Sequence, residues 1–342
     1  MKEIAFRIVC AAGVTTLCRR KNRGKIRILM YHGVVPAEME PFCWTQLPVR
    51  RFERQLKYLK RNHSILKLSE VLDKIQKGLP LPENTAVITF DDGYRNNATV
   101  AYPLLKRLGI PATVFLATGC ITDRALCWPD RLYLGLRDTV QENIDLREFG
   151  LKRYSLRTLK GKGAAQEDIV EYLKSMPWDK KEKILKDILG RLKVGPDREG
   201  TPFDLLTWEE IQSLNAEGLI EFGAHTVTHN ILSQMGEKDA EREIIDSCGM
   251  IEKQLGMKCL WFAYPNGRRR DFTPRSKEVL KANGVLCGLT TIPGLNDRTA
   301  DPLELRRISV GADMSSARFQ CLVSGLLYAW KDGFGGRDGH LD

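Results

Sequence analysis

Histidine is scarce in this chain: only five of the 342 residues are of this type. The nine cysteines include no Cys-x-x-Cys pair, and their odd, scattered set argues against both a disulfide framework and a cysteine zinc site. No internal repeat and no low-complexity tract is present, which excludes solenoid and disordered classes. These absences predict an ordinary globular protein with reduced, mostly buried thiols.

Long apolar runs are also missing from the N-terminal segment. Its uncharged run from Ile8 to Cys18 has 11 residues, whereas a helix that spans a bilayer needs about 20. A signal peptide has an apolar stretch of this length, but its positive charges come before that stretch, and here the main basic cluster follows it. We therefore expect a basic arm over residues 1–24 in a cytoplasmic protein.

Positive charge is concentrated in that arm. The whole chain carries +10, from 53 basic and 43 acidic residues. Residues 1–25 contain one acid, Glu3, and seven basic residues, a local charge of +6: Lys2, Arg7, Arg19, Arg20, Lys21, Arg23 and Lys25. No nucleic-acid-binding motif accompanies them, so we expect no nucleic acid partner. The arm is either an ordinary surface helix or an amphipathic helix in peripheral contact with an anionic membrane at its inner face. An export signal stays open as a third alternative.

Short apolar segments alternate with segments of helical periodicity, which predicts an α/β fold with a parallel sheet, open or closed into a barrel. The predicted strands cover residues 26–31, 86–90, 112–116, 220–224 and 260–264, and the predicted helices 51–62, 68–77, 100–108, 239–255 and 276–283. The polar residues that follow each strand should gather at one edge of the sheet.

One domain is expected over residues 25–325. Its alternation of strands and helices is interrupted at residues 125–206. This charged stretch has helical patterns near 166–176 and 180–193, which predicts a helical insertion. Residues 326–342 are rich in glycine and charge and are expected to form a flexible tail.

His225 and His229 are separated by three residues and follow a predicted strand. If a helical turn begins where the strand ends, both imidazoles face the same way, as in other His-x-x-x-His metal sites. Two imidazoles and one carboxylate suit Zn²⁺. The alternative for this spacing alone is ordinary surface or core polarity.

Asp91 and Asp92 follow another predicted strand and precede Gly93. Adjacent residues of an extended chain point in opposite directions, so the two carboxylates cannot share one role. One can bind a metal while the other acts as a general base. A plain Asp-Asp-Gly surface turn is the alternative.

Three motifs occur together in a specific order: Phe90-Asp91-Asp92-Gly93, His225-Thr226-Val227-Thr228-His229 and Phe262-Ala263-Tyr264-Pro265-Asn266-Gly267. In this the chain resembles, over residues 25–312, the polysaccharide deacetylases with a NodB-homology domain, also called carbohydrate esterase family 4. The resemblance implies a distorted (β/α) barrel and hydrolysis of the N-acetyl group of a hexosamine in a glycan.

The resemblance also implies roles for single residues. Asp91 corresponds to the catalytic base, and Asp92, His225 and His229 to the ligands of a divalent metal, with Zn²⁺ favoured and Ni²⁺, Co²⁺ or Fe²⁺ as alternatives. The backbone N–H of Asn266 corresponds to the donor that stabilises the oxyanion.

Two positions depart from the family pattern. Ala263 replaces an arginine that pairs with the catalytic aspartate, and we expect Arg306 or Arg307 to take its place. The usual histidine near the end of the domain is missing; His32 resembles its counterpart in a rearranged branch, where it protonates the departing amine. The alternative for His32 is a histidine hydrogen-bonded by backbone at a strand end.

The substrate-binding residues are expected to be Tyr264, Pro265, Asn266, Trp208 and Arg307. Trp128 could add a stacking face for a sugar, but core packing is an equal alternative for each aromatic residue. The expected substrate is an N-acetylhexosamine glycan of an exopolysaccharide or cell envelope. A lipid-linked or nucleotide-linked sugar, a non-sugar amide and a non-catalytic glycan-binding role are the alternatives.

Overall fold

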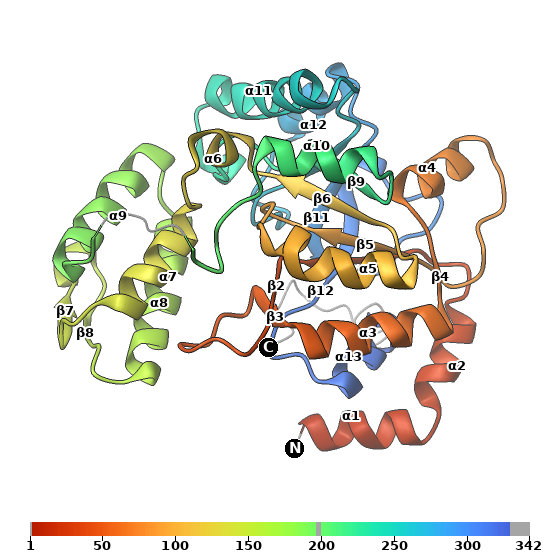
Figure 1. Ribbon diagram of the computed structural model, residues 1–342, viewed down its shortest axis with the longest axis horizontal. Coiled ribbons are helices and arrows are strands. Elements are labelled where there is room, and N and C mark those ends of the chain that lie inside the picture. Colours follow the sequence, from red (N-terminus) through yellow and green to blue (C-terminus); the bar gives the residue numbers. More distant parts are fainter. Residues whose placement is uncertain (1, 196–199, 329–342) are drawn as a thin grey trace.

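Seven parallel strands close into a barrel in the computed structural model, which describes residues 2–195 and 200–328 (Figure 1). Around the barrel the order is β1 (Arg27–Tyr31), β12 (Leu305–Ser309), β11 (Cys287–Pro293), β10 (Trp261–Ala263), β9 (Ile220–Ala224), β6 (Ala112–Leu116) and β5 (Thr85–Phe90). β5 pairs back with β1 and so closes the ring, and the short β4 (Ser64–Ile65) adds to β5 on its outside. The predicted barrel is confirmed, together with all five predicted strands; β11 and β12 were not among them.

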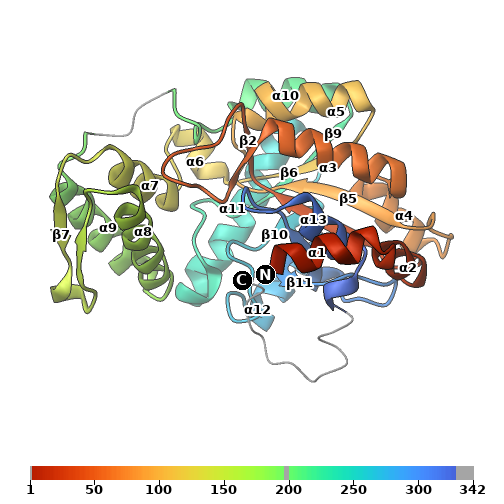
Figure 2. The ribbon, with the colours of Figure 1, turned by 90° about the horizontal axis from the view of Figure 1, so that it is seen from below.

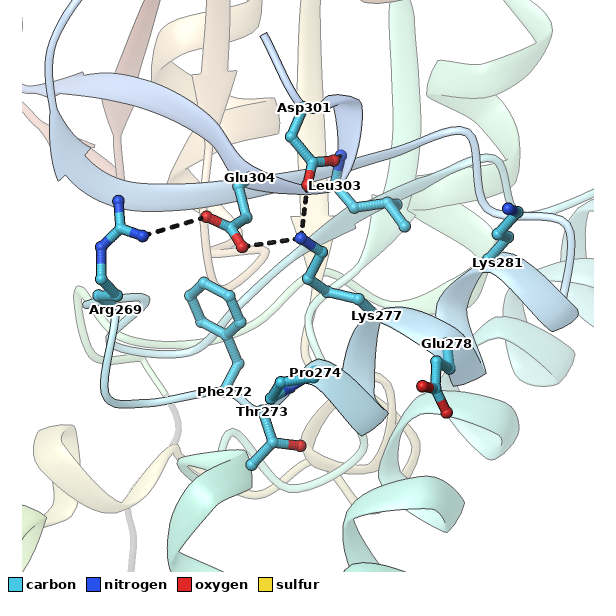
Figure 3. Close-up of a pocket in the computed structure, with 10 residues that line it drawn as sticks. All are labelled: Arg269, Phe272, Thr273, Pro274, Lys277, Glu278, Lys281, Asp301, Leu303 and Glu304. Carbon is cyan, nitrogen blue, oxygen red and sulfur yellow. Dashed lines mark hydrogen bonds and ion pairs between the residues drawn. The ribbon is translucent and has the colours of Figure 1, made fainter.

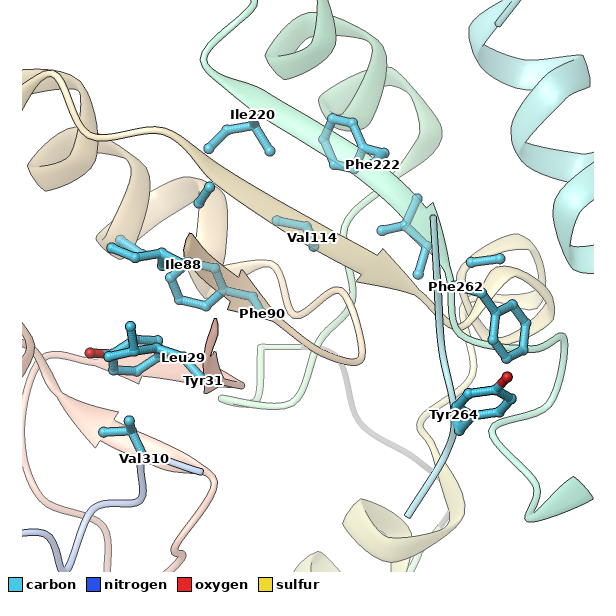
Figure 4. Packing of buried hydrophobic residues seen from close by; sticks show 14 of the residues in the cluster. Leu29, Tyr31, Ile88, Phe90, Val114, Ile220, Phe222, Phe262, Tyr264 and Val310 are labelled. Carbon is cyan, nitrogen blue, oxygen red and sulfur yellow. The ribbon is translucent and has the colours of Figure 1, made fainter. Parts of the chain in front are cut away.

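Both faces of the strands are buried, as expected for a closed parallel barrel. Alternate residues point outward and pack beneath the surrounding helices, among them Leu29, Ile88, Val114 and Phe222 (Figure 4). Residues that point to the other face of the strands form a second apolar cluster with residues of α4 (Leu68–Gln76). Its members on the strands are Ile28, Val87, Phe115, Trp261 and Leu289. The period of two along each strand therefore sorts the side chains between two cores.

Helices follow most of the strands and cover the barrel (Figure 1). They are α3 (Val49–Asn62), α4 (Leu68–Gln76), α5 (Tyr102–Leu108), α6 (Thr118–Asp123), α10 (Trp208–Ala216), α11 (Glu237–Leu255), α12 (Pro274–Ala282) and α13 (Ser316–Val323). A π-helical turn, η1 (Asn97–Ala101), precedes α5, and 3₁₀ turns η3 (Leu232–Gln234) and η4 (Pro302–Glu304) lie in later connections. Each of the five predicted helices overlaps one of these elements.

The segment between α6 and α10 forms the insertion, which projects from one side of the barrel in both views (Figures 1 and 2). It contains α7 (Trp128–Asp138), α8 (Leu159–Lys174) and α9 (Trp178–Leu192). The helical patterns predicted near 166–176 and 180–193 correspond to α8 and α9, and the insertion also contains a hairpin that was not predicted: β7 (Asn143–Asp145) and β8 (Arg153–Ser155) are antiparallel and flank the 3₁₀ turn η2 (Arg147–Phe149). These strands are too short for their alternation to stand out from the charged sequence. The insertion has its own apolar core.

The N-terminal arm folds into two helices, α1 (Lys2–Ala11) and α2 (Val14–Lys21), which lie along α13 (Figure 2). Gly13 joins them with a φ of 74°, a backbone conformation that favours glycine. A small two-stranded sheet, β2 (Gly33–Val35) and β3 (Gln46–Pro48), follows β1. None of the helices in the described ranges is both long and apolar enough to cross a bilayer. Most of the predicted tail, residues 329–342, lies outside the described residues.

Candidate active site

The candidate site lies where the barrel strands end at their carboxyl side, the usual place for active sites in such barrels. Asp91 and Asp92 follow β5, His225 follows β9, His32 follows β1, and Tyr264 follows β10. Parallel strands present all these ends at one rim. These residues are spread over more than 200 positions of the sequence, and closure of the barrel brings them together.

Asp92, His225 and His229 form a cluster with the geometry of a metal site. Asp92 Oδ1 lies 3.1 Å from His229 Nε2 and 3.5 Å from His225 Nε2. The three ligand atoms lie within 4.8 Å of one another. One carboxylate and two imidazoles are a donor set that suits Zn²⁺ and related ions and leaves further coordination positions open. The residues present therefore fit a divalent ion.

The orientation of His225 is set by a partner outside the cluster. Its Nδ1 lies 2.7 Å from the carbonyl oxygen of Ala263, so a proton on Nδ1 leaves the lone pair of Nε2 directed at Asp92. Burial lowers the pKa of His225 to about 4, although the carboxylates of Asp91 and Asp92 oppose the shift. The imidazole is therefore neutral at neutral pH, as a metal ligand must be.

The loop from His225 to His229 is not helical, so the predicted helical turn is wrong. Thr226 and His229 have φ values of 65° and 56°, in the left-handed region. Glu243 of α11 fixes this loop instead: its carboxylate accepts hydrogen bonds from Val227 N at 2.8 Å, Thr228 N at 2.9 Å and Thr228 Oγ1 at 2.6 Å. A strained backbone held by a buried carboxylate brings the two imidazoles together.

Asp91 has a different partner from Asp92, in line with the expectation that the two carboxylates divide between two roles. Arg307 donates to both of its carboxylate oxygens, at 2.7 Å each, and both side chains are buried. Burial by itself would raise the pKa of Asp91, but the Arg307 guanidinium and His225 outweigh it and hold that pKa below its ordinary value. Asp91 therefore stays a carboxylate.

Arg307 is the arginine that pairs with Asp91, whereas Arg306 on the same strand is exposed. Successive side chains of β12 point to opposite faces, so only one of the two can reach the barrel interior. Arg307 also donates through Nε to the Thr290 carbonyl at 2.7 Å. Its contacts place it as a positioning residue for Asp91, and the prediction that it contacts substrate has no support in this burial.

His32 follows β1, the neighbour of β5, and is partly buried, with its ring 4.9 Å from the ring of Trp44. Its Nδ1 is buried without a hydrogen-bond partner among the described residues, so the alternative of a ring held by backbone has no support. Burial lowers the pKa of His32, while the carboxylates of Asp92 and Asp91 act in the opposite direction. Trp44, 46% exposed beside His32, was not predicted because its loop has no regular pattern.

Asn266 adopts a φ of 59° in the turn after β10. Its side chain donates to Asp271 at 2.6 Å, and its carbonyl oxygen accepts from Thr291 Oγ1 at 2.6 Å. Its backbone N–H has no partner among the described residues, as a donor reserved for an oxyanion requires.

Two of the expected sugar-stacking residues are core residues. The ring of Tyr264 is fully buried, stacks on Phe272 at 4.2 Å and donates its hydroxyl to the Leu303 carbonyl, so the prediction of a substrate-binding face is wrong for it. Pro265 is likewise buried. Trp128 packs in the core of the insertion. Trp208 is partly buried and donates from its indole nitrogen to Thr122 Oγ1 at 3.1 Å.

The insertion reaches the metal loop through a buried lysine. Lys181 of α9 donates to Oδ1 of Asn230, the residue directly after His229. The Lys181 Nζ also lies 4.7 Å from the ring centre of Trp128. Burial lowers the pKa of Lys181 to about 8. Asn230 in turn donates to Thr228 Oγ1 at 2.6 Å, which links the insertion to the Glu243 contacts. No local pattern in the sequence marks Lys181, because the charged insertion contains many lysines.

A pocket of about 540 Å³ lies elsewhere, between α12 and η4 (Figure 3). Its charged groups pair with one another: Lys277 contacts Asp301 and lies 2.8 Å from Glu304, which also faces Arg269 at 3.8 Å. None of the site residues described above lines it. Because it is separate from the metal cluster and from Asp91, we assign it no part in the chemistry.

Comparison with known proteins decides the family. The sequence pattern of the polysaccharide deacetylases matches residues 78–287, more than half of the chain. The chain belongs to the polysaccharide deacetylase family. Its members, also called carbohydrate esterase family 4, are hydrolases that act on N-acetyl groups of carbohydrates.

Individual relatives agree with this polysaccharide deacetylase assignment. YxkH of Bacillus subtilis (strain 168) is 22% identical over 309 residues, which cover 90% of this chain and 79% of the relative. A poly-beta-1,6-N-acetyl-D-glucosamine N-deacetylase of Staphylococcus aureus is 41% identical over 70 residues, 20% of this chain and 24% of that protein. The solved structure of the Streptococcus pyogenes deacetylase PplD in complex with acetate has the same fold, with a TM-score of 0.58 and 20% identity over 88% of this chain and 99% of that one.

Proposed function

We propose that this polysaccharide deacetylase hydrolyses the N-acetyl group of a hexosamine in a bacterial-type glycan, of an exopolysaccharide or the cell envelope, and that it needs a divalent metal, most readily Zn²⁺. One observation carries the proposal: the two adjacent carboxylates after β5 have separate surroundings. Asp91 pairs with the buried Arg307, and Asp92 lies against His225 and His229. Such a division fits one base and one metal ligand.

A bound ion, held by Asp92, His225 and His229, would supply Lewis-acid chemistry by lowering the pKa of water and polarising the acetyl carbonyl. The chain's own groups account for the proton movements. Asp91, kept ionised by Arg307, accepts a proton from the attacking water. The backbone N–H of Asn266 stabilises the negative charge that develops on the carbonyl oxygen.

His32 completes the reaction by giving a proton to the amine as the C–N bond breaks, which releases acetate and a free hexosamine amine. Burial lowers the pKa of His32, and the carboxylates of Asp92 and Asp91 act against that shift, so these two groups support the protonated form that a general acid requires. His32 and Asp91 follow neighbouring strands, β1 and β5, so that both face the same reacting group. Turnover therefore needs an ionised Asp91 and a protonated His32 at the same time.

The choice of glycan rests on a named relative. The Staphylococcus aureus relative, by its name, acts on a polymer of β-1,6-linked N-acetylglucosamine, and similarity to it covers only part of each chain. That polymer is the first candidate substrate. A lipid-linked or nucleotide-linked sugar is the second candidate, favoured by the basic arm that packs on the barrel.

Acetate release tests the proposal. The purified chain is incubated with β-1,6- and β-1,4-linked N-acetylglucosamine oligomers and with lipid-linked N-acetylhexosamine, with and without a chelator. We expect release from at least one sugar, loss of it after chelation, and recovery when Zn²⁺ is added back. Activity that survives complete removal of the metal contradicts the metal-dependent mechanism. Stoichiometric metal binding with no acetate release from any of these sugars would instead indicate a glycan-binding relative.

A further inference from the structure

The outer face of α1 is apolar and has no partner among the described residues. Ile4 and Ile8 are each 63% exposed, and Leu17 on α2 is exposed to the same degree. The exposed apolar positions of the first helix and its turn recur at helical spacing: Ile4, Ala5, Ile8, Ala11 and Ala12. We call these residues together with Leu17 the α1 face.

The opposite side of α1 is already occupied by the barrel domain. Glu3 accepts a hydrogen bond of 2.6 Å from Ser315, the N-cap of α13, and Cys10 Sγ lies 3.6 Å from the Ala317 carbonyl oxygen. Figure 1 shows α1 at the lower edge of the molecule, next to α13, with its other side turned away from the body. A helix that is apolar on both sides is normally buried on both. The docked side therefore leaves the α1 face to be covered by something else.

Exposed cations lie on the same arm: one on α1, two on α2 and one just after it. Arg7, Arg20, Lys21 and Arg23 are all exposed, and Glu3 is the single acid of residues 1–25. Arg20 and Lys21 have no acidic partner within 4.0 Å among the described residues. A basic arm that combines an exposed apolar helix side with the unpaired cations Arg20 and Lys21 is complementary to a surface that is apolar inside and negatively charged at its rim.

We propose that the α1 face docks on an anionic lipid bilayer, with Ile4, Ile8 and Leu17 inserted at the headgroup boundary and the basic residues on the lipid phosphates. A second copy of the chain fits less well, because a symmetric contact would bring two arms of +6 against each other. The inference is independent of the proposed function, since docking needs neither metal nor substrate.

The docked side of α1, opposite the α1 face, is linked to the His32 side of the active site. Glu3 contacts Ser315, and three residues earlier Ala312 N donates to the Trp44 carbonyl at 2.9 Å. The Trp44 ring in turn lies against His32.

Vesicle binding of the full chain tests the proposal. The chain is sedimented with phosphatidylcholine vesicles that contain or lack phosphatidylglycerol. We expect binding only to the anionic vesicles, and binding that weakens as salt is raised. The variant Arg20→Gln/Lys21→Gln/Arg23→Gln should bind on the order of a hundredfold more weakly, at roughly fivefold per charge. The variant Ile4→Ser/Ile8→Ser/Leu17→Ser should lose more than about tenfold.

Matched controls lie on the insertion and on α11. Lys180, Lys183 and Lys186 are exposed on α9, so changing all three to Gln removes the same charge away from α1. Val140, Leu159 and Ile245 are exposed apolar residues on other elements, and their Ser variants match the apolar triple. Both controls should bind vesicles as the natural chain does.

Three results overturn the proposal: no preference for anionic vesicles, an equal loss in a control triple, or a dimer in sedimentation velocity that the apolar triple abolishes. The last result would assign the α1 face to a second copy of the chain. Circular dichroism checks that each variant is folded. If the apolar triple unfolds, the charge triple and the salt dependence still decide.

Discussion

Arg307 and Asp91 are 216 positions apart and form a two-pronged ion pair, with both N–O distances at 2.7 Å. Among the described residues, Arg307 is the one cation that forms hydrogen bonds with Asp91. The family pattern has a pairing arginine at the position of Ala263, and here Arg307 makes that pair from another strand. A planar guanidinium fixes both oxygens of a carboxylate at once, which holds Asp91 in one rotamer. The base is thus oriented from the last strand of the barrel.

Replacing Arg307 by Met should lower the rate of acetate release sharply and cost about 3–5 kcal/mol of stability, because it leaves a buried carboxylate without a counter-charge. Arg306→Met is the matched control, since Arg306 is exposed on the same strand. Its stability should change by no more than about 0.5 kcal/mol. Urea unfolding and acetate release measure the two effects. Equal effects of both variants would remove the positioning role of Arg307.

Changing Asp92 to Asn should abolish stoichiometric metal binding, because an amide oxygen is a much poorer ligand for Zn²⁺ than a carboxylate. Asp130→Asn is the control: Asp130 is also buried, but its carboxylate accepts from the Tyr94 hydroxyl at 3.0 Å and is not part of the cluster. Metal content per chain is measured after dialysis. Retention of a full equivalent of metal by Asp92→Asn would contradict the assigned ligand set.

The variant His32→Gln should keep its metal and lose about 100- to 10,000-fold in kcat, the range expected for removal of a general acid. Gln retains polarity and size but cannot give up a proton near neutral pH. Metal content and acetate release are measured on the same sample. An unchanged kcat rejects the acid role, and loss of metal together with kcat would assign His32 to the metal cluster instead.

Changing Glu243 to Gln should weaken metal affinity by about 10- to 100-fold, as is typical for residues that orient metal ligands. An amide offers one acceptor oxygen in place of the two that receive hydrogen bonds from Val227 and Thr228. Glu241→Gln, on the same helix, removes only a surface ion pair with Arg275 and should leave the affinity unchanged. Competition with a metal-binding dye gives both affinities. Similar values for the two variants would show that Glu243 does not hold the loop.

Stability should fall as the pH drops below 6.5, in part because of His63. Burial, with help from Arg27 and Arg19, lowers the pKa of His63 from 6.5 to about 3. Between these values the unfolded chain binds a proton that the folded chain does not, so acid favours unfolding. At pH 5 the loss from this residue is about 2 kcal/mol.

His63→Leu should therefore show a shallower loss of stability between pH 6.5 and 5 than the natural chain, by about 2 kcal/mol. Urea unfolding at each pH measures the slope, which a uniform change in stability does not move. His63 is remote from the metal cluster in sequence and is not a member of it. Parallel slopes for the two proteins would contradict the assignment.

The strands and their polar ends could be predicted because each depends on local sequence. Apolar runs stopped by glycine or charge predicted five of the seven barrel strands, and Asp91 and Asp92 were expected to divide between two roles, in line with the different partners of the two carboxylates. β12 escaped because Arg306 and Arg307 interrupt its apolar pattern. From the sequence alone an arginine is expected at the surface, unless the distant carboxylate that pairs with it is known.

The helical turn expected at His225–His229 failed for a similar reason. Spacing alone favours a helix, but the backbone there follows Glu243, which comes from another element and leaves no trace in the local pattern. Tyr264 was expected to face a sugar and is buried, because the periodicity of a strand marks two faces without telling which one is open to solvent.

The sequence by itself determined the alternating α/β pattern, the acidic pair after β5, the histidine pair after β9 and the basic arm. Each of these is written in neighbouring residues, where periodicity and backbone conformation act. Only the tertiary structure chose Arg307 over Arg306, gave the metal loop its support from Glu243, and left one face of α1 uncovered. Those outcomes depend on contacts between residues far apart in the chain, which form only when the barrel closes.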